Sequence, residues 1–280
     1  MKLLINYRTE YRYDTAVSFS PHLFRLLPKA DTHVVVERTN FETNPGADVQ
    51  YRRDLFDNIV ASCFYPGLNA TLMVRLAIEL RVEEKNPFHF LLAPHVMELP
   101  FTYEPHERQL LEPFLQAPPP GKLPFPTLDR GATLDVLLEL NAALFGGLTY
   151  KRREEGAAWT PEETLAAGGG ACRDFAVLLA AQLRRLGVAA RLASGYLWEG
   201  DGTGERRAEG ALHAWTEAYL PGAGWVGMDA ANGVFCNHRH ITTAVGLTPD
   251  DIAPISGRYY ADAPVRSAMS ASLDLAERDA

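Results

Sequence analysis

The stretch GGGACRDFAVLL, residues 168–179, leads from three glycines into a cysteine, a charged pair and an apolar run. Apolar residues continue at helical spacing as far as Gly187, so the pattern predicts a helix that begins at Cys172. Free N–H groups and the helix dipole favour negative charge at such a position, which lowers the pKa of a thiol there. On this stretch alone, Cys172 is either a reactive nucleophile or a small buried residue of the first helical turn.

Two later strand-like segments contain candidate partners for Cys172. In ALHAWTEAYL, residues 211–220, His213 shares a strand face with Trp215. In GWVGMDAANG, Asp229 ends the strand just before an Asn-Gly turn. If the YLPGAG turn makes the two strands a hairpin, Asp229 can accept a hydrogen bond from the second ring N–H of His213 and fix its orientation.

Each of these residues has an ordinary structural interpretation when it is taken alone. His213 is typical of a core histidine satisfied by a neighbour, and Asp229 of a carboxylate that caps a turn. Their order along the chain, after a cysteine at a helix start, instead indicates a nucleophile, a base and a residue that orients the base. The three together favour chemistry at Cys172 over simple packing.

The remaining patterns predict an α+β chain with two domains. Alternation at period 2 predicts an antiparallel β-sandwich at residues 1–85, in which Cys63 is a small buried residue. The proline-rich residues 86–130 are expected to form an extended connector with one short helix near PHERQLLEPFL. Helical segments and then strands predict a catalytic core at 131–265, followed by a C-terminal tail at 266–280.

Local signals describe the predicted core further. Thr133 and Thr160 are predicted helix N-caps, and Glu163 completes a capping box with Thr160. The polar, glycine-rich EGDGTGERRAEG, residues 199–210, is predicted to be a mobile loop.

Composition excludes several classes of protein. The formal net charge is −8 and the arginines are scattered, so no nucleic-acid partner is expected. No segment is typical of a membrane span, and the N-terminal apolar run is too short for a signal peptide, so a cytoplasmic location without membrane attachment is expected. Three widely spaced cysteines do not form a disulfide framework.

The segment CNHRH allows a different interpretation. Cys236, His238 and His240 would share one face if extended, and all three are borderline or soft metal ligands. A structural zinc site needs four ligands, however, and no partner pair lies near by in the sequence. We therefore expect neither a metal nor another cofactor.

Three segments carry a family resemblance: TPEETLAAGGGACRDFAVLLAAQLRRLGVAARLASGYL, HAWTEAYLPGAGWVGMDAANG and HITTAVG…DDIAP. They resemble the bacterial transglutaminase-like family of papain-type cysteine enzymes, and the first eighty-odd residues are similar to the β domain that commonly precedes that core. The resemblance implies Cys172 as nucleophile, His213 as general base and acid, and Asp229 as the residue that orients His213. It also implies that the nucleophile helix packs on an antiparallel sheet, and that His240 belongs to the family pattern.

Some positions depart from that pattern. The family commonly has Asp-Pro-Thr-Asn-Gly where this chain has DAANG at 229–233, and a His often follows DFA where this chain has Val177. GLTPDDIAP lacks the Arg-Asp-Tyr often found after that glycine. If these positions touch substrate, the specificity of this chain differs from that of its relatives.

The expected function is that of a cysteine enzyme acting on amide bonds of a peptide or protein substrate through a thioester, most simply as a protease- or amidase-type hydrolase. A transglutaminase that passes the acyl group to an amine, and a binding scaffold without turnover, are the alternatives. Gly170, Trp215 and His240 are the predicted substrate-binding residues, with packing beneath the sheet as the alternative for Trp215. The Cys172 N–H is the expected first oxyanion donor. The N-terminal domain is expected to present substrate or to bind a protein partner.

Overall fold

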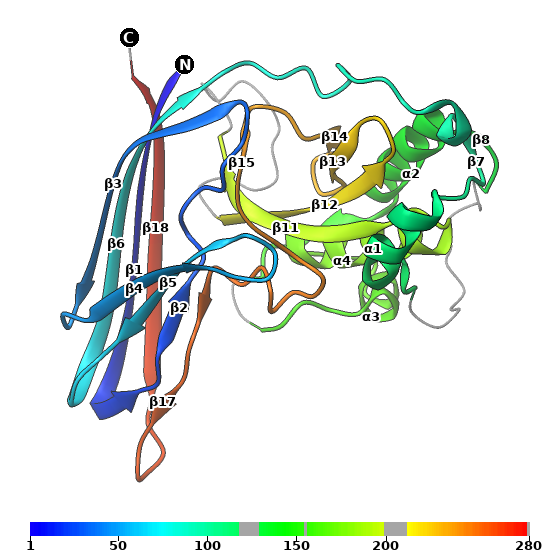
Figure 1. The fold of residues 1–280 in the computed structure, drawn as a ribbon. Helices are drawn as coiled ribbons and strands as arrows, with labels where there is room; N and C mark the ends of the chain where they lie inside the picture. Colours follow the sequence, from blue (N-terminus) through cyan, green and yellow to red (C-terminus); the bar gives the residue numbers. More distant parts are fainter. Residues whose placement is uncertain (118–128, 154–155, 199–211, 279–280) are drawn as a thin grey trace.

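Two antiparallel sheets packed on a shared apolar core form a sandwich from the N-terminal strands and the last strands of the chain (Figure 1). The structure is a computed structural model that describes residues 1–117, 129–153, 156–198 and 212–278. The strands of the larger sheet are β1 (Lys2–Phe19), β3 (Val34–Asn44), β6 (Leu68–Val82), β17 (Tyr259–Tyr260) and β18 (Ser267–Arg278). Those of the smaller sheet are β2 (His22–Phe24), β4 (Asp48–Arg53), β5 (Ile59–Phe64) and β16 (Ile255–Ser256). Their orders are β17-β1-β6-β3, with β18 also paired to β1, and β16-β2-β5-β4.

Strict alternation along β6 supplies much of this core. Every second side chain points inward and is buried, namely Leu72, Val74, Leu76, Ile78, Leu80 and Val82. All but Leu72, which packs against Val17 and Phe19, pack against side chains of β2 and β5, including Phe24 and Cys63. Cys63 is buried, as predicted, and burial raises the pKa of its thiol to about 11. The predicted antiparallel sandwich is confirmed.

The predicted C-terminal tail is instead a long strand of the sandwich. β18 pairs antiparallel with β1 from Lys2↔Arg278 to Tyr13↔Ser267. The chain also returns to the sandwich before residue 266, because β16 pairs with β2 and β17 with β1. The prediction of a tail at 266–280 was wrong because β18 is rich in serine and alanine, whereas its pairing satisfies main-chain groups that would otherwise form an open edge of β1.

The connector contains the predicted helix and lies against the core. α1 (Pro105–Leu115) matches the expected segment, preceded by a 3-10 turn, η1 (Pro94–Val96), and by β7 (Glu98–Leu99). The Tyr103 hydroxyl accepts a hydrogen bond from the Ala189 N–H at 2.9 Å and donates one to the Tyr219 carbonyl at 2.8 Å. These hydrogen bonds hold the segment 86–117 against the core sheet. Residues 118–128 of the predicted connector lie outside the described part.

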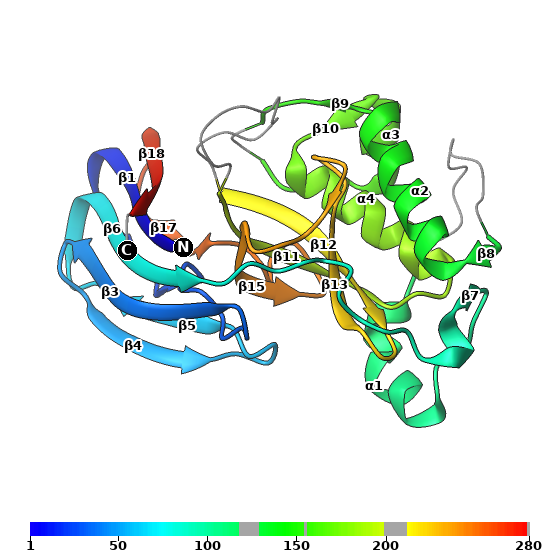
Figure 2. The same cartoon turned by 90° about the horizontal axis from the view of Figure 1, so that it is seen from above.

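A further antiparallel sheet and a set of helices form the predicted catalytic core. Its strands are β11 (Ala190–Leu197), β12 (Leu212–Leu220), β13 (Gly224–Asp229), β14 (Val234–Phe235) and β15 (His240–Gly246), in the order β14-β13-β12-β11-β15. The helices are α2 (Thr133–Gly147), α3 (Pro161–Ala166) and α4 (Cys172–Arg185), and the short strands are β8 (Gly131–Ala132), β9 (Thr149–Tyr150) and β10 (Gly169–Gly170). Figure 2 shows α4 lying along one face of the sheet, where the Thr216 hydroxyl donates to the Ala176 carbonyl at 2.8 Å. The predicted loop at 199–210 falls outside the described residues.

One of the two predicted N-caps is confirmed. Thr160 accepts a hydrogen bond from the Glu163 N–H, and the Glu163 side chain accepts one from the Thr160 N–H, as in a capping box. Thr133 is not an N-cap, because Ala132 occupies that position. The Thr133 hydroxyl instead donates to the Val96 carbonyl at 2.6 Å, which ties α2 to the connector.

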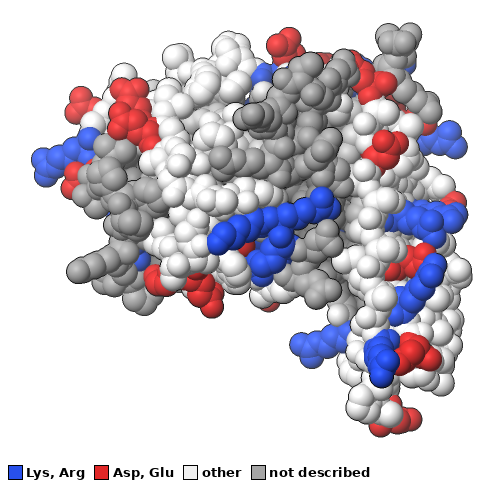
Figure 3. Space-filling view, turned by 180° about the vertical axis from the view of Figure 1, so that it is seen from behind, with Lys and Arg blue, Asp and Glu red and all other residues white. Residues whose placement is uncertain are grey.

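Charged side chains of both signs are interspersed on the face seen in Figure 3. The net charge of −8 is not gathered into one acidic patch on this face. None of the helices in the described residues is long and apolar enough to cross a bilayer.

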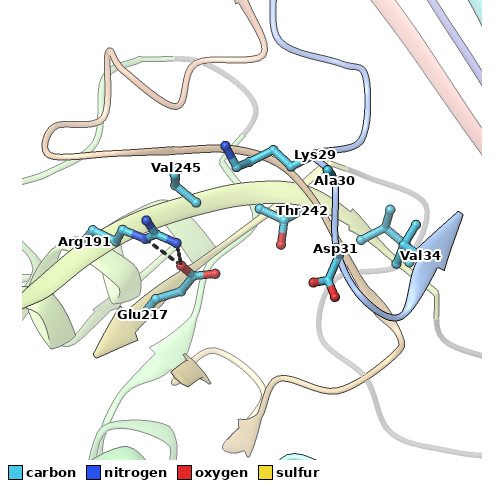
Figure 4. A pocket seen from close by; sticks show the side chains of 9 residues that line it. Lys29, Ala30, Asp31, Val34, Arg191, Glu217, Thr242 and Val245 are labelled. Carbon is cyan, nitrogen blue, oxygen red and sulfur yellow. Dashed lines mark hydrogen bonds and ion pairs between the residues drawn. The ribbon is translucent and has the colours of Figure 1, made fainter. Parts of the chain in front are cut away.

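Buried hydrogen bonds join the sandwich to the core sheet. The Asn58 amide donates to the Val245 carbonyl and accepts from the Val245 N–H, both at 2.8 Å. The Tyr196 hydroxyl donates to the Leu26 carbonyl at 2.9 Å. Between the two parts lies a pocket of about 100 Å³, beside the Arg191–Glu217 ion pair (Figure 4). These contacts hold the sheet face opposite α4 against the sandwich.

Replacing Asn58 by Ala is expected to lower the free energy of unfolding by about 2–4 kcal/mol, because the N–H and C=O of Val245 lose their partner in a buried position. Urea denaturation measures the change. Asn69→Ala, which removes an exposed hydrogen bond to Pro66, is the matched control and is expected to cost less than about 0.5 kcal/mol. Equal effects of the two substitutions would contradict the role given to Asn58.

Candidate active site

Cys172 is the first residue of α4, as predicted, and the glycines before it are held in a fixed conformation. Gly169 has φ +150°, and any side chain there would overlap the carbonyl oxygen of Thr149. A Cβ on Gly170 would lie 2.7 Å from the Cβ of Asp174. Gly169 and Gly170 form β10, which pairs parallel with β9. The glycines therefore let two strands and a helix start meet closely at Cys172.

Asp174 fixes the segment before the helix to its first turn. The carboxylate is fully buried and accepts from the Ala171 N–H at 2.8 Å. Its other oxygen accepts from the Arg153 guanidinium at 2.7 Å and from the Trp159 N–H at 2.8 Å. The Arg153 guanidinium also lies 4.2 Å from the centre of the Trp159 ring. A first-turn carboxylate could be predicted from local sequence, but its three partners could not.

His213 and Asp229 meet across the hairpin that the YLPGAG turn predicts. β12 and β13 pair antiparallel as far as Thr216↔Met228, so Asp229 lies one position beyond the last pair. The His213 Nε2 is 2.8 Å from the Asp229 Oδ2, and both side chains are fully buried. The structure thus brings these two predicted site residues into direct contact.

The Asp229 carboxylate has further donors that the sequence analysis did not identify. Its Oδ2 accepts from the Asn232 amide at 2.7 Å and lies 3.3 Å from the His240 Nε2. Its Oδ1 accepts from the main-chain N–H groups of Ala231 and Asn232 at 3.1 and 3.2 Å. The His240 Nδ1 accepts from the Asn237 N–H at 3.3 Å, so its Nε2 carries the proton that is donated to Asp229.

These donors keep Asp229 ionised. Burial by itself raises the pKa of Asp229, but the charge and hydrogen bond of His213, together with His240, outweigh it. The net result is a pKa well below the usual range. A buried carboxylate at this position therefore holds one ring nitrogen of His213 and stabilises its protonated form.

The second ring nitrogen of His213 is left for Cys172. Its Nδ1 is buried and has no nitrogen or oxygen partner in the described part of the chain. Burial raises the pKa of Cys172, but the hydrogen bond and charge of His213 and the Ala214 N–H outweigh it, so the pKa is lowered. Burial lowers the pKa of His213, whereas Asp229 and Cys172 raise it well above the ordinary value. Both directions favour a thiolate beside an imidazolium.

Tyr150 is a second residue beside the thiol that the sequence analysis missed. It pairs with Gly170 in the β9–β10 ladder, two residues before Cys172. Burial raises the pKa of its hydroxyl, and the neighbouring Cys172 charge and hydrogen bond raise it further. No motif marks Tyr150, because its position depends on the pairing of two strands that lie twenty residues apart.

The predicted substrate-binding residues lie mostly beneath the site. Trp215 is 1% exposed, stacks on His213 with ring centres 6.2 Å apart, and meets His240 edge-on at 5.3 Å. This packing matches the alternative stated for Trp215, a residue packed beneath the sheet. Gly170 is buried against Asp174, and His240 acts on Asp229.

The CNHRH side chains diverge. Cys236 lies against Gly227, the His238 Nδ1 accepts from the Lys85 N–H at 3.5 Å, and His240 faces Asp229. Within the described ranges, no three His, Cys, Asp or Glu side chains are arranged to hold a metal ion.

Two known protein families match parts of this chain. Residues 129–230 match the transglutaminase-like superfamily, and residues 3–82 match the bacterial transglutaminase-like N-terminal region. The chain carries a transglutaminase-like core. The resemblance stated from sequence is confirmed, and the transglutaminase-like core supports a cysteine-type enzyme.

Two mycobacterial proteins and one solved structure are similar to this chain over different lengths. An uncharacterized protein of Mycobacterium tuberculosis is 27% identical over 293 residues, which cover 97% of this chain and 91% of that protein. A protein of Mycobacterium leprae is 37% identical over 91 residues, 32% of each chain. The structure of a putative cysteine protease from Cytophaga hutchinsonii matches with a TM-score of 0.72 at 18% identity, covering 100% of this chain and 92% of that one. This likeness confirms the fold.

Replacing His213 by Ala is expected to slow alkylation of Cys172 by iodoacetamide about 100-fold at pH 6, because burial then acts on the thiol without an imidazolium to oppose it. The rate is followed against pH, with Cys172 identified by peptide mass spectrometry. The wild-type rate is expected to inflect below the free-cysteine pKa of about 8.5, and the variant rate above it. His238→Ala, whose ring contacts Lys85, is the control. A wild-type inflection at or above the free-cysteine value would contradict the thiolate–imidazolium pair.

Replacing Asp174 by Asn is expected to lower the free energy of unfolding by about 3 kcal/mol, since it leaves the Arg153 guanidinium without its buried counter-charge. Asp135→Asn is the matched control, because Asp135 lies in the first turn of α2 but is exposed, and it is expected to cost less than about 1 kcal/mol. Thermal and urea unfolding measure both. A loss for Asp174→Asn no greater than the control would show that Asp174 acts only on the helix dipole.

Proposed function

We propose that this chain is a cysteine hydrolase that cleaves amide bonds of peptides or proteins through a thioester on Cys172. The observation that carries the proposal is the buried contact between His213 and Asp229, which leaves the His213 Nδ1 for Cys172. The lowered pKa of the thiol and the raised pKa of the imidazole support it. So does the transglutaminase-like superfamily, whose match spans all three residues.

The acylation step follows from this geometry. The Cys172 thiolate adds to the amide carbonyl carbon, forming an S–C bond while the carbonyl π electrons move to oxygen. The Cys172 N–H, which has no acceptor one turn earlier in the helix, faces the developing oxyanion. The His213 imidazolium then gives its proton to the nitrogen as the C–N bond breaks, and the amine leaves a thioester behind.

In deacylation, His213 acts as the general base. Neutral His213 takes a proton from water, whose oxygen adds to the thioester carbonyl carbon. The tetrahedral intermediate expels the Cys172 thiolate and releases the acid, which restores the starting ion pair. Throughout, Asp229 keeps the ring of His213 in place, and Asn232 and His240 keep Asp229 ionised and oriented.

The same thioester would serve a transglutaminase if an amine replaced water. We favour hydrolysis because water is always present, and the described residues offer no distinct acceptor-amine site on which transfer could be argued. The N-terminal sandwich, in this proposal, presents the substrate or binds a protein partner.

Trapping the acyl-enzyme tests the proposal. The protein is incubated with a peptide library in ¹⁸O-water, with and without a lysine-like amine, and Cys172 adducts and products are read by mass spectrometry. We expect an acyl group on Cys172 and ¹⁸O in the released acid. Cys172→Ala is expected to lower turnover by at least about 1000-fold, whereas Cys63→Ala, in the sandwich core, is expected to retain turnover.

The other outcomes would identify a different function or overturn the proposal. Products that carry the amine in place of ¹⁸O would identify a transglutaminase. Full activity of Cys172→Ala would overturn the proposal. A Cys172 that forms no acyl adduct and reacts no faster than a free thiol would identify a scaffold without turnover.

A further inference from the structure

The main chain of β9 leaves one edge open beside the thiol. The Thr149 N–H donates to the Gly168 carbonyl at 3.0 Å, and the Lys151 N–H donates to the Gly170 carbonyl at 2.8 Å. In a parallel ladder, alternate residues turn their N–H and C=O to opposite sides. Tyr150 stands between Thr149 and Lys151, so its N–H and C=O point away from β10. They have no partner among the described residues.

That open edge borders a recess. Residues 146–150 line a space of about 430 Å³, and none of the charged side chains in the described part of the chain lines it. Gly146 and Thr149 are exposed, and a Cβ added to Gly146 would meet no atom within 4 Å. The space beside Gly146 therefore leaves room for an extended main chain to approach the Tyr150 N–H and C=O.

Tyr150 also lies close to Cys172. Tyr150 is paired with Gly170, and its hydroxyl lies beside the thiol. Side chains of a strand stand perpendicular to the ladder direction, whereas the main-chain groups point along it. A chain added at the Tyr150 edge would therefore run past the side of the thiol rather than cover it.

We propose that the β9 edge at Tyr150 binds substrate as an added strand, by main-chain hydrogen bonds to an uncharged, extended peptide segment next to the scissile bond. This inference rests on the proposed hydrolase function, and it adds that the substrate binds in an extended conformation. Selectivity at this position comes from the main chain and from side-chain size, since the described residues that line the recess carry no charge.

Peptide aldehydes test the edge without knowledge of the natural substrate. An acetylated tri-alanine aldehyde adds to Cys172 when the thiolate forms an S–C bond and the carbonyl oxygen takes the imidazolium proton. The probe is compared with versions that are N-methylated at one amide each. Methylation of the amide that pairs with Tyr150 is expected to weaken inhibition about 10-fold, because it removes that hydrogen bond and blocks the strand, while the other positions change it less than about 3-fold.

A protein variant tests the same edge from the other side. Gly146→Leu places a side chain in the recess at a position without positive φ, and Ala142→Leu, one turn earlier on α2 and exposed, is its matched control. The readout is the rate of tri-alanine aldehyde addition divided by the rate of iodoacetamide alkylation, so a change in thiol reactivity cancels. We expect Gly146→Leu to lower this ratio at least about 10-fold and Ala142→Leu to leave it within 2-fold.

The outcomes separate the two proposals. Three outcomes would each overturn the proposal that the β9 edge binds substrate. The first is an equal effect of all N-methylations, and the second is an unchanged ratio for Gly146→Leu. The third is a Cys172 that iodoacetamide alkylates but that does not add to the aldehyde. A Cys172 that reacts with neither reagent would overturn the proposed hydrolase and, with it, the inference that rests on it.

Discussion

The buried negative charge of Asp229 is the constraint on which the rest of the site depends. A carboxylate removed from water is costly unless it is paired and hydrogen-bonded. Here the side chains of His213, Asn232 and His240 and two main-chain N–H groups approach its two oxygens. Because these donors come from strands β12 and β15 and from the turn between β13 and β14, the charge fixes where those elements meet. The orientation of His213 and its approach to the proposed nucleophile follow from that arrangement.

Elements on both faces of the core sheet hold the site around Asp229 in place. α4 covers one face of the core sheet and brings Cys172 beside His213 of β12, while the sandwich holds the opposite face through Asn58 and Tyr196. Asp174 ties the residues before α4 to its first turn, so the helix start cannot shift independently of the glycines. β18 pairs with β1 in the larger sheet. Each support satisfies buried polar groups that would otherwise be left unpaired.

Local patterns predicted a large part of this structure. The alternation of β6, the capping box of α3, the start of α4 and the β12–β13 hairpin all depend on residues close in sequence, and all were predicted. The β18 strand was missed because its main-chain pairing with β1 gives its own residues no distinctive pattern. Thr133 was assigned a cap because its hydroxyl partner, Val96, lies far away in the chain.

The order of Cys172, His213 and Asp229 was readable from sequence, because a helix start, a strand face and a strand end are local properties of the chain. Sequence alone also placed these residues in a transglutaminase-like core, whose superfamily match spans all three. Only the tertiary structure decided that Trp215 lies beneath the site, that Asn232 and His240 reach Asp229, and that Tyr150 leaves an open edge beside the thiol. Those contacts join segments that no local periodicity relates, and they form because buried charges and main-chain groups must find partners wherever the fold brings them.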